Sequence, residues 1–109
     1  MITSDLEIMS SQQISKQDIG ITFVPGAKLI KAAGAPDGIR GLEVIATADR
    51  ARIQHAGFEG FDGVGDVALW LDVNADNVLL LNLIFGPGMT SNIETNSYET
   101  FVQALTMEL

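Results

Sequence analysis

Cysteine is absent from the 109 residues of the sequence, and histidine occurs only once. A chain without cysteine has no disulfide framework and no thiolate metal site, so a metal ion would have to bind through other ligands, chiefly oxygen. The length fits a single domain that buries roughly two thirds of the surface of the unfolded chain. The composition, 47% apolar and 18% charged, is typical of a folded domain rather than of a disordered chain.

Basic side chains are missing from the second half of the sequence. All six lie at or before Arg52, whereas eight acidic residues follow Ile53. The first half is therefore neutral, and the second half carries the whole net charge of −8. Because a nucleic-acid backbone binds clustered cations, this half is not expected to bind nucleic acid directly. Its charge indicates either a solvated acidic face or a surface that meets a cationic partner.

The sequence also lacks a long apolar run. The longest, residues 78–85, is interrupted by Asn82 and is far shorter than the roughly 20 residues that a helix needs to cross a bilayer. The first residues have neither the basic start nor the apolar core of a signal peptide. We therefore expect a cytoplasmic protein without a membrane partner.

Turn residues and apolar periodicity divide the chain into a polar lead, residues 1–18, and one domain, residues 19–109. The lead is rich in Ser and Gln, and it is either flexible or opened by one short helix. Residues 19–24 predict a strand and residues 27–34 a short helix. Residues 42–58 are compatible with a helix, but alternating β-branched residues favour two strands. No internal repeat is evident.

The last third of the sequence has the clearest pattern. Two apolar segments within residues 67–85 flank a group of turn residues and predict a β-hairpin. A loop follows, and apolar residues at helical spacing predict a helix from Tyr98 to Glu108, which a capping box of Asn96 and Glu99 would begin. We therefore predict a β-rich α+β domain. It would have a mainly antiparallel sheet, the C-terminal helix packed on one face, and one or two short N-terminal helices.

Both faces of the predicted hairpin are apolar, which is unusual for an antiparallel sheet with one solvated side. The hairpin is therefore covered on both sides by the chain itself, or one face contacts another molecule. Large apolar side chains dominate interface energies, and nearby carboxylates give electrostatic selectivity. The expected partner-binding residues are Trp70, Leu81, Phe85, Asp62, Asp66 and Asp72.

The polar segment DVNADN places Asp72, Asn74 and Asp76 at the first, third and fifth positions of an EF-hand calcium loop. The sixth position of such a loop needs a sharp turn and is usually Gly, but here it is Asn77. The twelfth position needs a bidentate Glu, but here it is Leu83. The segment is therefore interpreted as a turn, and no metal or cofactor is expected.

These patterns favour a non-enzymatic, small acidic protein of the adaptor, chaperone, immunity or inhibitor type, which binds another protein or itself. Two alternatives stay open. One is a small enzyme or ligand binder that uses His55 with Asp49, Arg50 and Arg52, because a histidine beside a carboxylate can act as a general base. The other is an inhibitor whose acidic half imitates nucleic acid.

Overall fold

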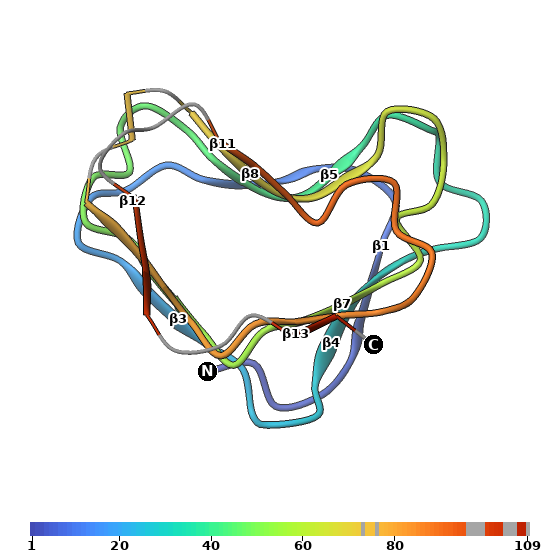
Figure 1. The fold of residues 1–109 in the computed structure, drawn as a ribbon, viewed down its shortest axis with the longest axis horizontal. Helices are drawn as coiled ribbons and strands as arrows, with labels where there is room; N and C mark the ends of the chain where they lie inside the picture. The colour runs from blue at the N-terminus through green and yellow to red at the C-terminus, as the bar shows by residue number, and fades with distance from the viewer. Residues whose placement is uncertain (73, 76, 96–99, 104–106, 109) are drawn as a thin grey trace.

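The computed structural model describes residues 1–109 apart from residues 73, 76, 96–99, 104–106 and 109. The described residues form strands and connecting loops, and no helix occurs among them. The strands make three sheets in which neighbouring strands run parallel. The protein is therefore an all-β parallel β-solenoid, and its three sheets form the sides of a triangle in the view down the shortest axis (Figure 1).

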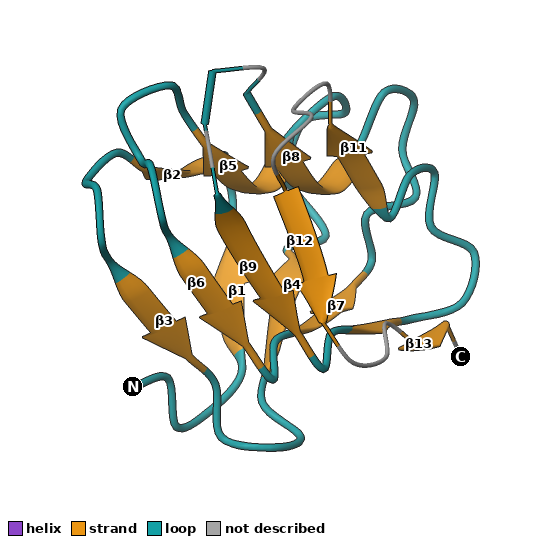
Figure 2. Cartoon of the chain, turned by 60° about the vertical axis from the view of Figure 1, so that its left-hand side comes forward, coloured by secondary structure: helices purple, strands orange, loops and turns teal. Residues whose placement is uncertain are grey.

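Each sheet collects one strand from each successive circuit of the chain. The first sheet contains β1 (Leu6–Ile8), β4 (Lys28–Lys31), β7 (Gly57–Glu59), β10 (Ile84–Phe85) and β13 (Met107–Glu108). The second sheet contains β2 (Gln12–Ile14), β5 (Arg40–Val44), β8 (Val67–Leu71) and β11 (Ile93–Thr95). The third sheet contains β3 (Gly20–Thr22), β6 (Arg52–Gln54), β9 (Val78–Leu81) and β12 (Thr100–Gln103), which lie side by side in Figure 2.

Inward-pointing side chains stack in columns along the axis of the solenoid. In the first sheet, Leu29, Phe58 and Phe85 lie opposite one another on adjacent strands, and each is at most 2% exposed. The rings of Phe58 and Phe85 are stacked, with centroids 5.2 Å apart and an interplanar angle of 11°. Burial of each such side chain contributes about 1.5–3 kcal/mol, so these columns stabilise the fold.

Two corners of the triangle are built from residues with positive φ. Arg50 (φ 59°) and Asn77 (φ 57°) each precede a strand of the third sheet, and His55 (φ 61°) and Asn82 (φ 53°) each follow one. The members of each pair are one circuit apart. The left-handed conformation turns the chain sharply from one sheet to the next, and Asn adopts it more readily than most residues with a Cβ.

The predicted antiparallel hairpin is wrong. Strands β8 and β9 belong to different sheets and pair with strands from other circuits, in parallel. Between them, Asp72 accepts hydrogen bonds from the N–H groups of Asn74 and Ala75, at 2.9 and 3.0 Å, in a turn. Turn residues indicate that a chain changes direction, but not that it reverses. Both segments are apolar because each faces the same enclosed interior.

The predicted helices are also wrong. Strands β12 and β13 lie within the segment predicted as a helix from Tyr98 to Glu108, and the capping-box residues Asn96 and Glu99 lie outside the described residues. Strand β4 replaces the short helix predicted for residues 27–34, and β1 lies in the polar lead, which was expected to be flexible or to open with a short helix. Pairing with a neighbouring strand satisfies the backbone of these segments and overrides their weak helical propensity.

Other elements agree with the sequence pattern. The strand predicted within residues 19–24 is confirmed as β3. The two strands favoured within residues 42–58 are confirmed as β5 and β6, and a third strand in this range, β7, was not predicted. The segment interpreted as a polar lead contributes β1 and β2, which pair with β4 and β5. A structural repeat was not predicted, although residues 27 apart in sequence, such as Leu42 and Leu69, lie opposite each other in the second sheet.

Candidate functional site

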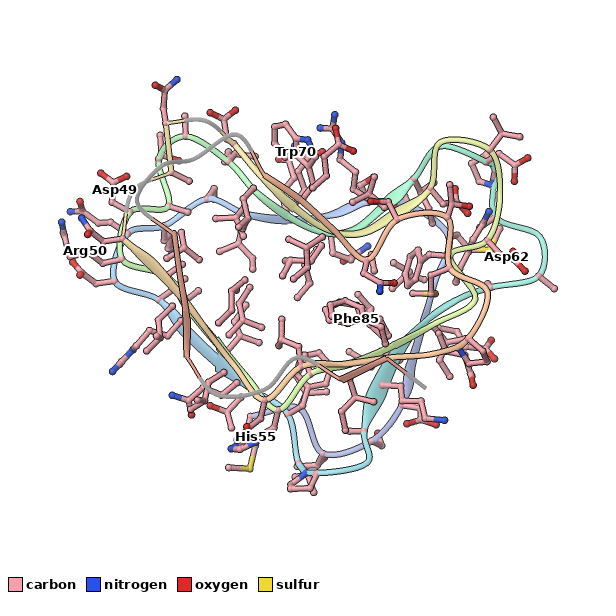
Figure 3. All side chains as sticks on the ribbon, viewed as in Figure 1. Asp49, Arg50, His55, Asp62, Trp70 and Phe85 are labelled. Carbon is pink, nitrogen blue, oxygen red and sulfur yellow. The ribbon has the colours of Figure 1, made fainter. Side chains whose placement is uncertain are left out.

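The three apolar side chains expected to bind a partner lie on different parts of the solenoid. Trp70 is half-buried on the outer face of the second sheet, and Leu81 is half-buried at the end of β9 in the third sheet. Phe85 points into the interior, where it is only 2% exposed (Figure 3). The structure therefore does not bring these three residues together. Figure 3 labels Trp70, which lies on the outside, and Phe85, which lies inside.

The three carboxylates expected beside them are also dispersed. Asp62 is exposed on the loop that follows β7, and Asp72 is half-buried at the end of β8. Asp66 is fully buried at the start of β8. Its carboxylate accepts hydrogen bonds from Lys31 Nζ at 2.6 Å and from the backbone N–H groups of Gly38 and Gly63 at 2.6 and 2.8 Å. Asp66 therefore connects the end of β4 to two loops from inside the fold.

The electrostatics of Asp66 and Lys31 fit this structural role. Burial on its own would raise the pKa of the Asp66 carboxyl, but the hydrogen bonds from Lys31, Gly63 and Gly38 outweigh it and hold the pKa below its ordinary value. The hydrogen bond to Asp66 in turn raises the pKa of the Lys31 ammonium. Both groups are therefore charged at neutral pH, and the side chain of Lys31 is only 8% exposed.

Trp70 lies in a network of polar side chains on the outer face of the second sheet. Gln13, Glu43, Trp70 and Glu94 occupy equivalent positions on the four adjacent strands of that sheet. The guanidinium of Arg40 lies over the Trp70 ring, 3.8 Å from the ring centroid. These five residues, Gln13, Arg40, Glu43, Trp70 and Glu94, are called the Trp70 platform below.

The Trp70 platform is held in place by its own contacts. Arg40 Nη1 donates a hydrogen bond to Glu43 Oε2 at 2.7 Å, and Gln13 Nε2 donates to Glu43 Oε1 at 2.8 Å. Glu43 is 9% exposed, so burial of its charge is compensated by hydrogen bonds at both carboxylate oxygens. A cation over an aromatic face contributes about 0.5–1 kcal/mol when exposed and more when it is desolvated. The platform thus presents a fixed aromatic ring beside fixed charges.

The residues of the enzyme alternative lie at two different corners and, in the case of Arg52, in strand β6 between them. Asp49 and Arg50 are at the corner before β6, whereas His55 is at the corner after it (Figure 3). Arg50 Nε donates to Asp18 Oδ1 at 2.6 Å, and this contact lowers the pKa of the Asp18 carboxyl. His55 Nδ1 lies 3.5 Å from Asn82 Nδ2 of the next circuit. The structure therefore does not place His55 beside Asp49 and Arg50.

A hollow of about 250 Å³ lies beside His55, between the corner and the outer face of the first sheet. Gly57 and Gly86 line it together with Lys28, Glu59 and Ile84, and Lys28 Nζ lies 3.5 Å from Glu59 Oε1. Its lining combines apolar groups with one exposed ion pair. Among the described residues, no group of three or more His, Cys, Asp or Glu side chains is arranged to hold a metal ion.

Comparison with known proteins adds no assignment: no protein-family model, no curated protein and no solved structure matches the chain. In the part of the chain that the structure describes, no helix is long and apolar enough to cross a membrane.

Trp70 was predicted from the sequence as a partner contact, whereas the residues that surround it in the fold were not predicted. Arg40, Glu43 and Gln13 come from other circuits, 27 to 57 residues earlier in the chain. A comparison of the sequence with itself at a spacing of 27 residues aligns Glu43 with Trp70, Val44 with Leu71 and Phe58 with Phe85. That spacing is the sequence signal that places Glu43 beside Trp70.

Proposed function

We propose that the protein is a non-enzymatic binding module that contacts another protein through the Trp70 platform on the outer face of the second sheet. The observation that carries the proposal is the half-buried Trp70 ring under the Arg40 guanidinium, with Arg40 itself held by Glu43. Tryptophan and arginine are the residues most enriched where truncation to alanine costs binding energy in protein interfaces.

Preorganisation supports this choice of surface. Four of the five platform side chains already contact one another: Glu43 binds Arg40 and Gln13, and Arg40 lies over Trp70. Binding a partner therefore costs little conformational entropy for ordering them, which leaves more of the contact energy as affinity. The separation of His55 from Asp49 and Arg50 favours binding over catalysis.

The charge distribution indicates the chemistry of the partner. Glu94 is exposed at one side of Trp70 in the same row of the sheet, and the half of the chain that contains both carries the whole net charge of −8. A protein with a basic surface next to an apolar or aromatic anchor complements this arrangement. Because exposed charges are screened by salt, association should slow as the ionic strength rises.

The proposal is tested by affinity capture with matched variants. Wild-type protein, Trp70→Ala and Leu81→Ala would be immobilised at equal density, and the proteins that each retains from a cell extract would be quantified by mass spectrometry. Leu81 is the control because it is also half-buried and apolar but lies in the third sheet. We expect a partner that Leu81→Ala retains and Trp70→Ala loses. Equal retention by a folded Trp70→Ala protein would contradict the proposal.

A further inference from the structure

The outer face of the first sheet has a gap at a glycine. Lys28, Gly57 and Ile84 occupy equivalent positions on β4, β7 and β10. Because Phe58 points into the core, its neighbour Gly57 faces outward, where the hollow of about 250 Å³ lies. A Cβ built on Gly57 would lie 2.9 Å from Lys28 Cγ and 3.0 Å from the Ala27 carbonyl oxygen, too close for both. Glycine therefore leaves the gap open, with Lys28 on one side and Ile84 on the other.

Much of the lining of this hollow is apolar. Ala27, Ile84 and Pro87 contribute to it, together with the glycines at positions 57 and 86. Ile84 is 39% exposed, so an apolar group bound in the hollow would remove part of its side chain from water. The volume is smaller than the roughly 300–1,000 Å³ of sites for drug-sized ligands. The hollow therefore suits a small ligand with a short apolar body.

Charged groups of both signs border the hollow. Lys28 Nζ lies 3.5 Å from Glu59 Oε1, and the two side chains are 42% and 48% exposed. Such an exposed ion pair contributes little to stability, because water solvates both charges. A ligand that carries both charges can therefore replace this contact with two of its own at little cost. The hollow offers a cation and an anion beside an apolar surface.

His55 adds a hydrogen-bond donor to the lining of the hollow, from the corner that follows β6 (Figure 3). Its Nδ1 lies 3.5 Å from Asn82 Nδ2, and an amide nitrogen can only donate a hydrogen bond. Nδ1 is therefore the acceptor, and the neutral imidazole carries its proton on Nε2. The Nε2–H group is a donor that a carboxylate can accept from. His55 and Lys28 thus give the hollow two donors for an anionic group.

We propose that this hollow binds a free α-amino acid with an apolar side chain of about the size of leucine. The ligand carboxylate accepts hydrogen bonds from Lys28 and His55, and the ligand ammonium donates to Glu59. A single carbon atom separates the two charged groups of an α-amino acid, so one head group reaches both members of the pair of Lys28 and Glu59. The apolar side chain of the ligand lies over Gly57 and covers Ile84.

The two charges of the hollow favour this ligand over a simple anion or a simple cation. An anion bound to Lys28 stays beside the Glu59 carboxylate, and a cation bound to Glu59 stays beside the Lys28 ammonium, so each is repelled by a like charge. A zwitterion pairs with both groups. The hollow lies on the first sheet and the Trp70 platform on the second, so binding of an amino acid goes beyond the proposed function and does not depend on it.

The first test uses His55, the only histidine of the chain, as a reporter. Its imidazole resonance would be followed by NMR at constant pH while L-leucine, isocaproate, isoamylamine or glycine is added. Isocaproate lacks the ammonium of leucine, isoamylamine lacks the carboxylate, and glycine lacks the side chain. We expect a saturable shift with leucine and an affinity at least tenfold weaker for each of the other three. The absence of a saturable shift with leucine, or equal affinity for any of the three analogues, would overturn the proposal.

The second test compares variants by calorimetric titration with leucine. His55→Asn removes the imidazole but suits the left-handed corner, as Asn82 does in the next circuit. Lys28→Met removes the ammonium but keeps an apolar stem beside Gly57. We expect each variant to lose at least tenfold in affinity. Lys16→Met, which makes the same change at an exposed lysine between β2 and β3, should bind like the wild type. Unchanged affinity in folded His55→Asn and Lys28→Met would place leucine elsewhere and overturn the proposal.

Discussion

Asp66 and Lys31 form an ion pair that connects three segments of the chain from inside the fold. Asp66 is fully buried, and its carboxylate is bound by Lys31 and by two backbone N–H groups from two loops. An acidic residue in an acidic half of a chain looks like part of a solvated surface, but this one is an internal connection. Asp62, four residues earlier, is the exposed carboxylate of the same loop.

Asp66→Asn should lower the free energy of unfolding by about 3 kcal/mol, because it leaves the shielded Lys31 ammonium without its main counter-charge. Asp62→Asn should change it by less than about 0.5 kcal/mol, since Asp62 is exposed. Urea denaturation of the two variants and the wild type measures both values. Equal stability of the three proteins would show that Asp66 does not connect the loops as described.

The stability contributed by this pair should depend on pH at both extremes. The pKa of the Asp66 carboxyl lies below its ordinary 3.8, so its contribution is complete above pH 3.8 and is lost as the pH falls through the lower, folded-state pKa. The pKa of Lys31 lies above its ordinary 10.5, so its contribution is complete below pH 10.5 and is lost as the pH rises through the higher value. The stability difference between wild type and Asp66→Asn should therefore be constant between these limits and shrink outside them. A difference that stays constant down to pH 2 would contradict this account.

At the scale of elements, the corners determine the path of the chain more than the strands do. The strands of the solenoid are only two to five residues long, and such segments form wherever a neighbour offers hydrogen bonds. The sharp changes of direction depend on left-handed residues, such as His55 and Asn82, at the same corner of successive circuits. The single histidine, His55, therefore lies at a corner that requires the left-handed backbone conformation.

His55→Val should destabilise the protein by about 1–2 kcal/mol, because a β-branched residue is strained at a φ of 61°. His55→Asn should be nearly neutral, since Asn82 occupies the equivalent position in the next circuit. Gln54→Val is the matched control, because it introduces the same side chain within β6, where Val is favoured. Thermal unfolding of the three variants ranks them, and a His55→Val protein as stable as Gln54→Val would disprove the role given to this corner.

The sequence predicted individual strands better than their arrangement. Alternating apolar residues indicate a strand and its buried face, and they correctly favoured strands within residues 19–24 and 42–58. Alternation does not indicate which strand lies alongside, because the neighbour in a solenoid is a full circuit away. The hairpin prediction assumed that segments adjacent in sequence pair with each other, as they do in most small sheets. Paired residues are 27 apart between β5 and β8, but they are 32 apart between β3 and β6 and 22 apart between β9 and β12, so no single period marks the circuits in the sequence.

At the scale of the whole molecule, the solenoid has the shape of a triangular prism, and its three outer sheet faces differ from one another. The outer face of the second sheet carries Trp70 beside the ion pair of Arg40 and Glu43. The unequal distribution of charge is evident from the sequence, and the contact of Trp70 with a partner stays a prediction. The prediction grouped Trp70 with Phe85 and Asp66, both of which the fold buries. Whether a side chain on a strand points into the core or outward depends on tertiary contacts, which a single sequence does not specify.

The proposed function depends on contact between Trp70 and the partner. The fluorescence emission of Trp70 measures that contact most directly. Trp70 is the only tryptophan in the chain, so the fluorescence of the unlabelled protein reports on the platform alone when a captured partner without tryptophan at its interface is added. We predict a saturable change in Trp70 emission. We also predict an affinity that falls at least tenfold in Trp70→Ala, measured by calorimetry, and stays unchanged in Leu81→Ala. Partner binding that leaves the emission of Trp70 and the affinity of Trp70→Ala unchanged would contradict the central claim.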